Sequence, residues 1–219
     1  MRSLTMVFVA LVLLAGCGSD DDSPSAGDNP TEVTECADVD APGAREPESG
    51  DAPSEGLDDS TTYTLVFDTS CGAFTITLDT ELAPKTAASL VALANAGYFD
   101  DTIFHRVVPG FVIQGGDPTQ RGDGGPGYST VDVPPSDAAY TQGVVAMAKT
   151  QVEAPGTSGS QFFVVTGADA GLTPDYAVLG KVTKGMDVVQ AIGELGDPAS
   201  GAGTPLQSVV IEGTKVREL

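Results

Sequence analysis

The sequence predicts a mainly β domain, built as an antiparallel barrel with two helices and preceded by a long polar N-terminal region. Three observations favour this class. Many short apolar runs are separated by turns rich in glycine and proline, helical spacing occurs in two segments, and no internal repeat is found. Residues 61–219, which carry these patterns, are enough for one domain with a core of its own.

The domain is expected to open with a β-hairpin. Apolar and polar residues alternate over residues 63–68 and again over residues 73–79, which is typical of strands with one buried face. Residues 69–72 between them read Thr-Ser-Cys-Gly and have the composition of a turn. The two runs therefore pair as neighbouring antiparallel strands.

Two amphipathic helices are expected to pack against the sheet. The first covers residues 84–96, with Pro84 suited to its first turn and Gly97 to its C-terminal end. A second, shorter helix covers residues 186–192, and a last strand follows near residues 208–216. The apolar stripe of the first helix is made of Ala87, Leu90, Val91 and Ala94.

A further hairpin is expected around Pro109 and Gly110. A two-residue Pro-Gly loop would splay the flanking strands, so we predict a three-residue loop over residues 109–111. Side-chain alternation then puts a cation and an amide on one apolar face, either as a solvated sheet edge or as a site that binds a ligand. The predicted pairs are Val108 with Val112, Val107 with Ile113 and Arg106 with Gln114, and the shared face holds Arg106, Val108, Val112 and Gln114.

Residues 104–117, Phe-His-Arg-Val-Val-Pro-Gly-Phe-Val-Ile-Gln-Gly-Gly-Asp, closely resemble the signature of the cyclophilin-type peptidyl-prolyl isomerases. Residues 159–163, Gly-Ser-Gln-Phe-Phe, are similar to a second block of that family, and the likeness extends over residues 63–216. The resemblance implies a closed eight-stranded antiparallel β-barrel capped by two α-helices. It also implies isomerisation of X-Pro bonds in proline-containing polypeptides by a monomer without cofactor or metal.

Isomerisation of an X-Pro bond has a barrier of about 20 kcal/mol, which arises because amide resonance is lost as the bond twists. A catalyst therefore needs no nucleophile or base, but it must hold the proline and favour a twisted amide with a pyramidal nitrogen. An arginine can donate to the substrate carbonyl and approach that nitrogen in the transition state. By resemblance, Arg106 takes this role, Gln114 orients it from across the hairpin, and Phe111 completes the catalytic set.

The resemblance also implies a set of substrate-binding residues. Each apolar member alone is commonly a core residue, whereas the polar groups among them need partners that the fold or a ligand supplies. Ala148 is expected to line a side-chain pocket, and the main chain of Lys149 to pair with the substrate. The proline pocket is assigned to Phe111, Val112, Phe163 and Leu172 with Tyr176 at its rim, and Gln161 joins the polar set.

The sequence departs from the family pattern at several positions. Lys149 stands where many members have asparagine, and the loop over residues 150–158 is longer, so the neighbouring specificity pocket is expected to differ. Gly171 stands where many members have the tryptophan that contacts cyclosporin, which predicts weak binding of that drug. Tyr176 replaces a histidine of eukaryotic members. His105, the single histidine of the chain, falls on the face opposite Arg106 and is expected to be structural.

Residues 1–16 are predicted to be a signal peptide. Arg2 precedes an apolar run over residues 6–15, which is too short to span a membrane. The run ends in Leu-Ala-Gly followed by Cys17 and resembles a bacterial lipobox, so we expect lipidation of Cys17 and anchoring to the cell membrane on its extracytoplasmic side. An ordinary signal peptide with an incidental cysteine is the alternative.

Residues 17–60 are expected to be the lipidated cysteine followed by a disordered acidic tether. Large apolar residues are scarce there, so burial cannot offset the entropy of ordering the chain. The tether carries most of the formal net charge of −21, which argues against a nucleic-acid partner and suits a spacer above an anionic membrane; a plain soluble linker is the alternative. Cys36 and Cys71 are predicted to form a disulfide in an oxidising compartment, and metal binding is the weaker alternative.

Three functions remain in competition. An isomerase that assists folding of exported proteins explains Arg106, Gln114 and Gln161 together with the apolar set. A non-catalytic module of the same fold would have lost the arginine or the ring pocket. A lipid-anchored solute-binding protein would need a longer, two-lobed α/β chain, which this sequence of 219 residues is not.

Overall fold

The computed structural model describes residues 35–47 and 49–219, so the predicted signal peptide and Cys17 lie outside the described residues. Within the described residues, nine strands form one sheet, and two short strands, β6 (Thr130–Val131) and β8 (Thr157–Ser158), pair separately. The strands of the large sheet are β1 (Tyr63–Thr69), β2 (Gly72–Leu78), β3 (Thr102–Ile103), β4 (Arg106–Val108), β5 (Val112–Gly115), β7 (Val144–Met147), β9 (Phe162–Val165), β10 (Val178–Lys184) and β11 (Val210–Glu218).

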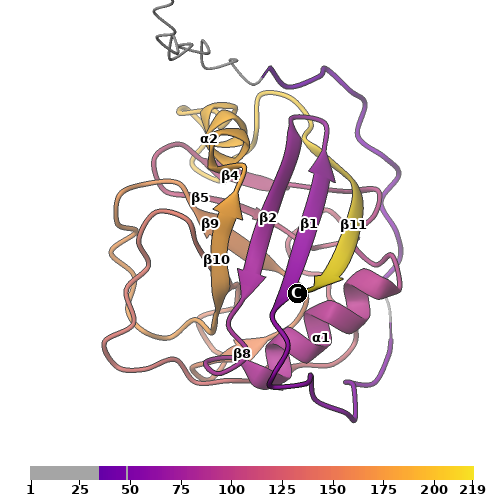
Figure 1. Ribbon diagram of the computed structural model, residues 1–219. Coiled ribbons are helices and arrows are strands. Elements are labelled where there is room, and N and C mark those ends of the chain that lie inside the picture. Colours follow the sequence, from indigo (N-terminus) through magenta and orange to yellow (C-terminus); the bar gives the residue numbers. More distant parts are fainter. Residues whose placement is uncertain (1–34, 48) are drawn as a thin grey trace, which may run out of the picture. The chain divides into compact units, whose positions relative to one another are not determined.

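The large sheet is antiparallel throughout and curls on itself (Figure 1). Its order is β3-β11-β1-β2-β10-β7-β9-β5-β4, so both ends of the order belong to one segment, residues 102–108, interrupted at Phe104 and His105. Counted as one interrupted strand, this segment gives eight strands. The predicted mainly β fold with a curled antiparallel sheet and two helices is confirmed.

The opening hairpin forms where the alternation predicted it. Strands β1 and β2 pair in the register that sets Phe67 opposite Phe74, and the two rings stack with centroids 5.2 Å apart inside the barrel. Both side chains are fully buried. Aromatic pairs of this kind contribute about 0.5–1.5 kcal/mol beyond the area they bury, so the hairpin is fixed by its inner face.

Both helices lie at the expected places. Helix α1 (Pro84–Asn95) starts with proline in its first turn and is followed by Gly97 at φ +71°, a left-handed conformation that glycine adopts without strain. It packs against β11, and α2 (Met186–Glu194) packs against β2 (Figure 1). Helix α2 ends two residues later than predicted. In this added part, Gly193 is buried against the side chain of Thr166. Among the described residues, no helix combines the length and apolar character required to cross a membrane.

The strands β5, β7 and β9 bury both of their faces, which creates a second apolar cluster outside the barrel. Neighbouring residues on a strand point to opposite faces, so Phe162 and Ile113 enter the main core while Phe163 and Val112 face outward. The outer cluster is completed by Tyr140, Ala146 and Val165. This arrangement places aromatic surface on the outside of the sheet, where a ligand can reach it.

Residues 35–47, named the strap from here on, differ from the predicted disordered tether. They contain no helix or strand, as composition suggested, but they lie against the domain. The predicted disulfide between Cys36 and Cys71 is present, and Ala37 N donates to Ser70 O at 2.8 Å. The composition argument counted apolar side chains alone, whereas a covalent bond and main-chain hydrogen bonds hold this segment. The ordered unit therefore starts before residue 61.

Candidate active site

The hairpin of β4 and β5 adopts the predicted register, with Arg106 opposite Gln114. The three-residue loop is confirmed: Phe111 N donates to Val108 O at 3.1 Å, and Gly110 takes the left-handed conformation at φ +67°. Arg106 and Gln114 lie half-buried on the outer face, whereas Val107 and Ile113 are fully buried in the barrel. The strand pairing thus holds a guanidinium and an amide side by side on an apolar surface.

Nine of the ten residues predicted for substrate contact line one cavity, named the apolar pocket. The Arg106 guanidinium lies 5.8 Å from the centroid of the Phe111 ring, a cation–π distance that turns the cation toward the pocket. Gln151 also lines it, which the sequence did not indicate because this residue sits in the variable loop after β7. The predicted residues that line it are Arg106, Phe111, Val112, Gln114, Ala148, Lys149, Phe163, Leu172 and Tyr176.

An aromatic trio supports the floor and wall of the apolar pocket. The Phe163 and Tyr176 rings meet edge to face with centroids 5.6 Å apart, and Tyr140 meets Tyr176 in the same way at 5.9 Å. The Tyr140 hydroxyl donates to Tyr176 O at 2.6 Å and accepts from Tyr176 N at 3.0 Å. Burial raises the pKa of Tyr140, so this hydroxyl stays neutral and keeps the proton that it donates. Tyr140 was missed from the sequence because an isolated tyrosine carries no signal of its partner.

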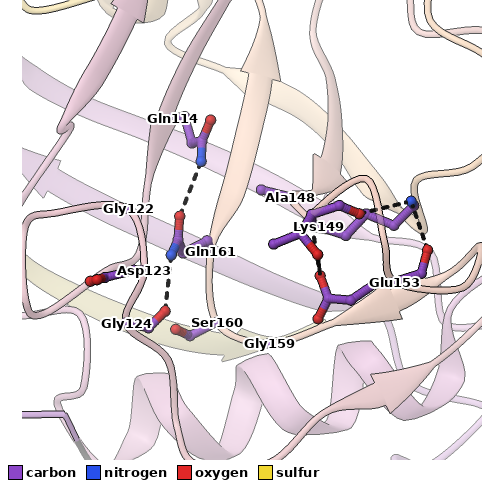
Figure 2. A pocket seen from close by; sticks show the side chains of 11 residues that line it. Gln114, Gly122, Asp123, Gly124, Ala148, Lys149, Glu153, Gly159, Ser160 and Gln161 are labelled. Carbon is purple, nitrogen blue, oxygen red and sulfur yellow. Dashed lines mark hydrogen bonds between the residues drawn. The ribbon is translucent and has the colours of Figure 1, made fainter. Parts of the chain in front are cut away.

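A second cavity, named the polar pocket, adjoins the first and shares Gln114, Ala148 and Lys149 with it. The tenth predicted residue, Gln161, lies here. Figure 2 shows a chain of amides: Gln114 Nε2 donates to Gln161 Oε1 at 3.0 Å, and Gln161 Nε2 donates to Gly124 O at 2.9 Å. Gln114 was expected to orient Arg106, but the hydrogen bond that it donates goes to Gln161. Its relation to Arg106 is that of a cross-strand neighbour.

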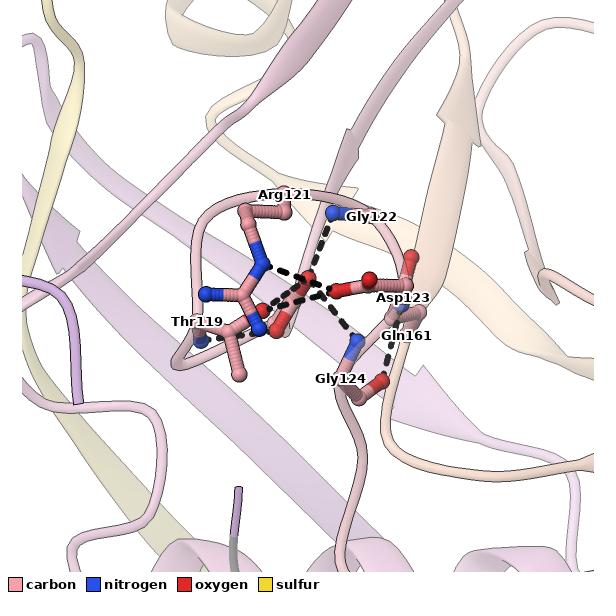
Figure 3. Close-up of polar contacts among 7 residues, drawn as sticks. Thr119, Arg121, Gly122, Asp123, Gly124 and Gln161 are labelled. Carbon is pink, nitrogen blue, oxygen red and sulfur yellow. Dashed lines mark hydrogen bonds and ion pairs between the residues drawn. The ribbon is translucent and has the colours of Figure 1, made fainter. Parts of the chain in front are cut away.

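One wall of the polar pocket is the loop over residues 117–124, named the Asp117 loop. The Asp117 carboxylate has no solvent exposure and accepts from Thr119 N at 2.7 Å, Gly122 N at 2.6 Å and Gly124 N at 3.2 Å. The three donor residues are labelled in Figure 3. A Cβ on Gly124 would lie 2.1 Å from the carboxylate, so this close approach requires glycine. Burial alone would raise the pKa of Asp117, but the hydrogen bonds from Thr119, Gly124 and Gly122 outweigh it and keep the pKa below its ordinary value.

The other wall of the polar pocket comes from the long loop after β7. The Lys149 ammonium donates to Thr150 O at 3.2 Å and to Glu153 O at 3.1 Å, and it lies 5.5 Å from the centroid of the Tyr176 ring. Glu153 Oε2 in turn accepts from Thr150 N at 2.6 Å (Figure 2). The loop that was expected to differ from the family is therefore closed by its own lysine and glutamate.

His105 and Gly171 complete the set of residues singled out from the sequence. Both ring nitrogens of His105 are buried without a hydrogen-bond partner among the described residues. Burial lowers the pKa of His105, the Arg106 charge lowers it further and Asp117 opposes both, so the ring stays neutral as a structural group. Gly171 is exposed at φ +61°, and a Cβ there would meet no atom within 4 Å.

Taken together, the site offers one guanidinium and three amide side chains, those of Gln114, Gln151 and Gln161, beside an aromatic cavity. Such groups can hold a ring and donate to a carbonyl or to a developing lone pair, because the arginine fork presents several N–H donors in a fixed geometry. They suit a reaction in which bonds rotate while the charge distribution changes.

Comparison with known proteins places this site in a family. The family described as cyclophilin type peptidyl-prolyl cis-trans isomerase/CLD matches residues 64–216. Peptidyl-prolyl cis-trans isomerase-like 1 of Emericella nidulans is 37% identical over 158 residues, 70% of this chain and 94% of the relative. The protein of the same name from Neurospora crassa is 37% identical over 159 residues, 70% of this chain and 94% of the relative.

Comparison with solved structures points to the same family. The crystal structure of a cyclophilin type peptidyl-prolyl cis-trans isomerase of Cryptosporidium parvum superposes with a TM-score of 0.64 at 28% identity, covering 71% of this chain and 98% of that chain. A second structure of the same protein, in the presence of the dipeptide Ala-Pro, gives a TM-score of 0.63 at 29% identity, with 70% and 98% covered. The chain belongs to the cyclophilin-type family and is a peptidyl-prolyl cis-trans isomerase.

Proposed function

We propose that this isomerase acts on X-Pro bonds of exported polypeptides, with Arg106 as its catalytic residue. The observation that carries the residue assignment is the position of Arg106: its guanidinium lies over the Phe111 ring at the apolar pocket and beside Gln114. A proline-containing segment is the ligand that matches an apolar ring pocket next to a donor for a peptide carbonyl.

In this proposal the proline ring rests in the apolar pocket on Phe111, Phe163 and Leu172. Burial of an apolar ring is worth about 25 cal/mol per Å² and binds cis and trans forms alike, so it contributes to affinity and not to the rate. Rate enhancement comes from Arg106, which donates to the carbonyl and then meets the nitrogen as its lone pair localises. That interaction is strongest when the amide is twisted, which lowers the barrier.

The polypeptide on either side of the proline is proposed to run across both pockets. Ala148 and the main chain of Lys149 lie where the pockets meet, so a chain held there passes from the apolar pocket into the polar one. Gln161 is then placed to bind the substrate main chain, because its amide faces the polar pocket (Figure 2). These contacts fix the flanking residues while the X-Pro bond rotates.

The test is the rate of cis–trans exchange in a short X-Pro peptide, measured by a protease-coupled assay. Arg106→Ala is expected to lower kcat/KM by about 10²-fold or more, as for removal of one preorganised donor. Arg106→Lys should recover part of the rate, because it keeps the charge but loses the planar fork. Arg217→Ala, at an exposed position on β11, is the matched control and should change nothing. A folded Arg106→Ala protein with near-normal kcat/KM would remove Arg106 from this role.

The extracytoplasmic, lipid-anchored location rests on the lipobox-like sequence ending in Cys17, and the Cys36–Cys71 disulfide supports an oxidising compartment. Cys17→Ser is expected to move the protein from the membrane fraction to the soluble fraction. The wild type should resist extraction by salt and dissolve in detergent, because a multiply acylated cysteine binds firmly. Release of the wild type by salt alone would contradict the anchor.

A further inference from the structure

The strap and the Asp117 loop are in direct contact, although the strap lies outside the family match of residues 64–216. Arg45 N donates to Pro118 O at 2.9 Å, and Gln120 Nε2 donates to Pro42 O at 2.8 Å. The strap has no ladder or helix of its own, so its course is set by these bonds and by the Cys36–Cys71 disulfide.

Gln120 shows that the contact bears on the conformation of the loop. It has φ +63°, a left-handed conformation that is unfavourable for a residue with a side chain, and the other such non-glycine residue described is Asp101. A residue stays there when its surroundings hold it. The hydrogen bond to Pro42 O on the strap is one such restraint, and the turn bond from Gln120 N to Asp117 O at 3.1 Å is another.

Arg45 provides a second link between the strap and the polar pocket. Its guanidinium lies 5.7 Å from the centroid of the Tyr98 ring and donates to Tyr98 O. The Ser160 hydroxyl donates its proton to Gly116 O at 2.7 Å. The Tyr98 hydroxyl is therefore the donor in its hydrogen bond with Ser160 Oγ at 3.1 Å. Tyr98 and Ser160 are both buried, so this link is shielded from solvent.

The link through the Asp117 loop ends at Gln161, and the link through Arg45 ends at its neighbour Ser160. The Asp117 loop presents Gly124 O to Gln161 Nε2, which leaves Gln161 Oε1 turned toward the amide of Gln114, and Ser160 is the residue next to Gln161 in the chain (Figures 2 and 3). A side-chain amide has two ends of similar shape and opposite polarity, so the carbonyl of Gly124 decides which end faces Gln114. A displaced loop would free this amide to turn over.

We propose that the strap is a positioning element of the isomerase site: Pro42 and Arg45 hold the Asp117 loop and Tyr98 so that Gln161 presents its oxygen to Gln114 and the second N–H of its Nε2 to the substrate. The inference rests on the proposed roles of Gln114 and Gln161. It makes the catalytic unit of this chain larger than the segment that matches the family, with the disulfide fastening the added part.

The experiment compares kcat and KM of the full chain for an X-Pro peptide long enough to span both pockets. Arg45→Ala and Gln120→Ala are each expected to lower kcat/KM by about 3- to 10-fold, mainly through KM, which is the size of one or two lost hydrogen bonds. Glu46→Ala is the matched control, because it alters an exposed side chain of the same strap next to Arg45, and it should leave both constants unchanged.

A double-mutant cycle separates positioning from general destabilisation. In a Gln161→Ala background, Arg45→Ala and Gln120→Ala should change kcat/KM by less than about 2-fold, since the group that they position is gone. Equal losses with and without Gln161, or no loss in folded single variants, would overturn the proposal. Gln120→Ala alters a surface contact of the Asp117 loop. It therefore still tests the proposal if Arg45→Ala does not fold. A wild type without isomerase activity would instead count against the proposed function.

Discussion

The apolar and polar pockets adjoin each other and share Gln114, yet they are built differently. The apolar pocket stands on strands β5 and β9, whose ladder bonds fix Val112 and Phe163 in place. The polar pocket stands on two loops, each closed by a single carboxylate, Asp117 in one and Glu153 in the other. Main-chain ladder bonds therefore fix the apolar pocket at Val112 and Phe163, while the polar pocket depends on a few side-chain bonds.

Asp117→Asn should break the polar pocket and spare the apolar one, and we expect it to have the largest effect of the changes considered below. One carboxylate oxygen is replaced by a donor, which leaves buried N–H groups of the Asp117 loop without an acceptor and lowers the free energy of unfolding by about 3 kcal/mol. Binding of the dipeptide Ala-Pro should stay within about 2-fold, because Asp117 does not line the apolar pocket and the ladder between β5 and β9 holds Val112 and Phe163.

Denaturant unfolding and titration of Ala-Pro measure the two sides of this comparison. Asp123→Asn, at an exposed carboxylate of the same loop, is the control and should be neutral in both. An equal loss of Ala-Pro binding in Asp117→Asn would show that the two pockets are not independent.

Gly171→Trp should strengthen the binding of cyclosporin and leave turnover nearly unchanged. An indole can bury on the order of 200 Å² against cyclosporin, so we expect about 10-fold or greater tightening of a drug that is expected to bind the wild type weakly. The left-handed backbone at φ +61° opposes any side chain there, so Gly171→Ala is the control for backbone strain. Cyclosporin titration decides the matter, with turnover expected to change little. Tight inhibition of the wild type would show that the missing ring is not needed.

Tyr140→Phe should weaken the apolar pocket and leave the polar one intact. It removes the hydroxyl that bonds both main-chain groups of Tyr176, at a cost of about 1 kcal/mol, or about 5-fold in Ala-Pro affinity. The NMR signals of the Gln161 side-chain amide should not move. Unchanged Ala-Pro affinity would mean that Tyr176 holds its position without Tyr140.

His105 lines neither pocket, and near neutral pH its substitution is expected to have the smallest effect. Burial lowers the pKa of His105 from the ordinary 6.5. The ring therefore stays neutral in the folded protein at a pH where the same ring takes up a proton in the unfolded chain. Stability contributed by the neutral ring is complete above pH 6.5 and falls as the pH drops below it, by at most about 1.4 kcal/mol per pH unit. Urea unfolding at several pH values should show a flatter profile for His105→Gln. Equal profiles for both proteins would exclude this group as the cause.

The strand-built half of the molecule was predictable and the loop-built half was not. Alternation fixes which residues of a hairpin share a face, so the pairing of Arg106 with Gln114 followed from the sequence. Helix α1 followed likewise from its spacing and its proline. The family signature included Asp117, but its role depends on bonds to main-chain N–H groups, which leave no mark on residue type.

The strap was missed for a related reason. A composition poor in apolar residues predicts little burial, and this held for most of residues 35–47 and 49–60, which are largely exposed. What composition does not measure is a bond between segments far apart in the chain, such as Gln120 to Pro42 or Arg45 to Tyr98. A signal was present in the paired cysteines, since Cys71 lies at the turn of the first hairpin and brings Cys36 to it.

That disulfide also decides how a mechanical load would enter the domain. A pull on the chain before Cys36 passes through the covalent bond to Cys71, at the turn between β1 and β2, and continues into the barrel. The disulfide closes a covalent loop with residues 37 to 70, and the strap residues within this loop lie off the direct path of the load. Pro42 and Arg45 lie within this covalent loop. A force applied at the N-terminal end is therefore not transmitted directly to their hydrogen bonds with the site. The reduced chain would transmit the same force through the strap itself.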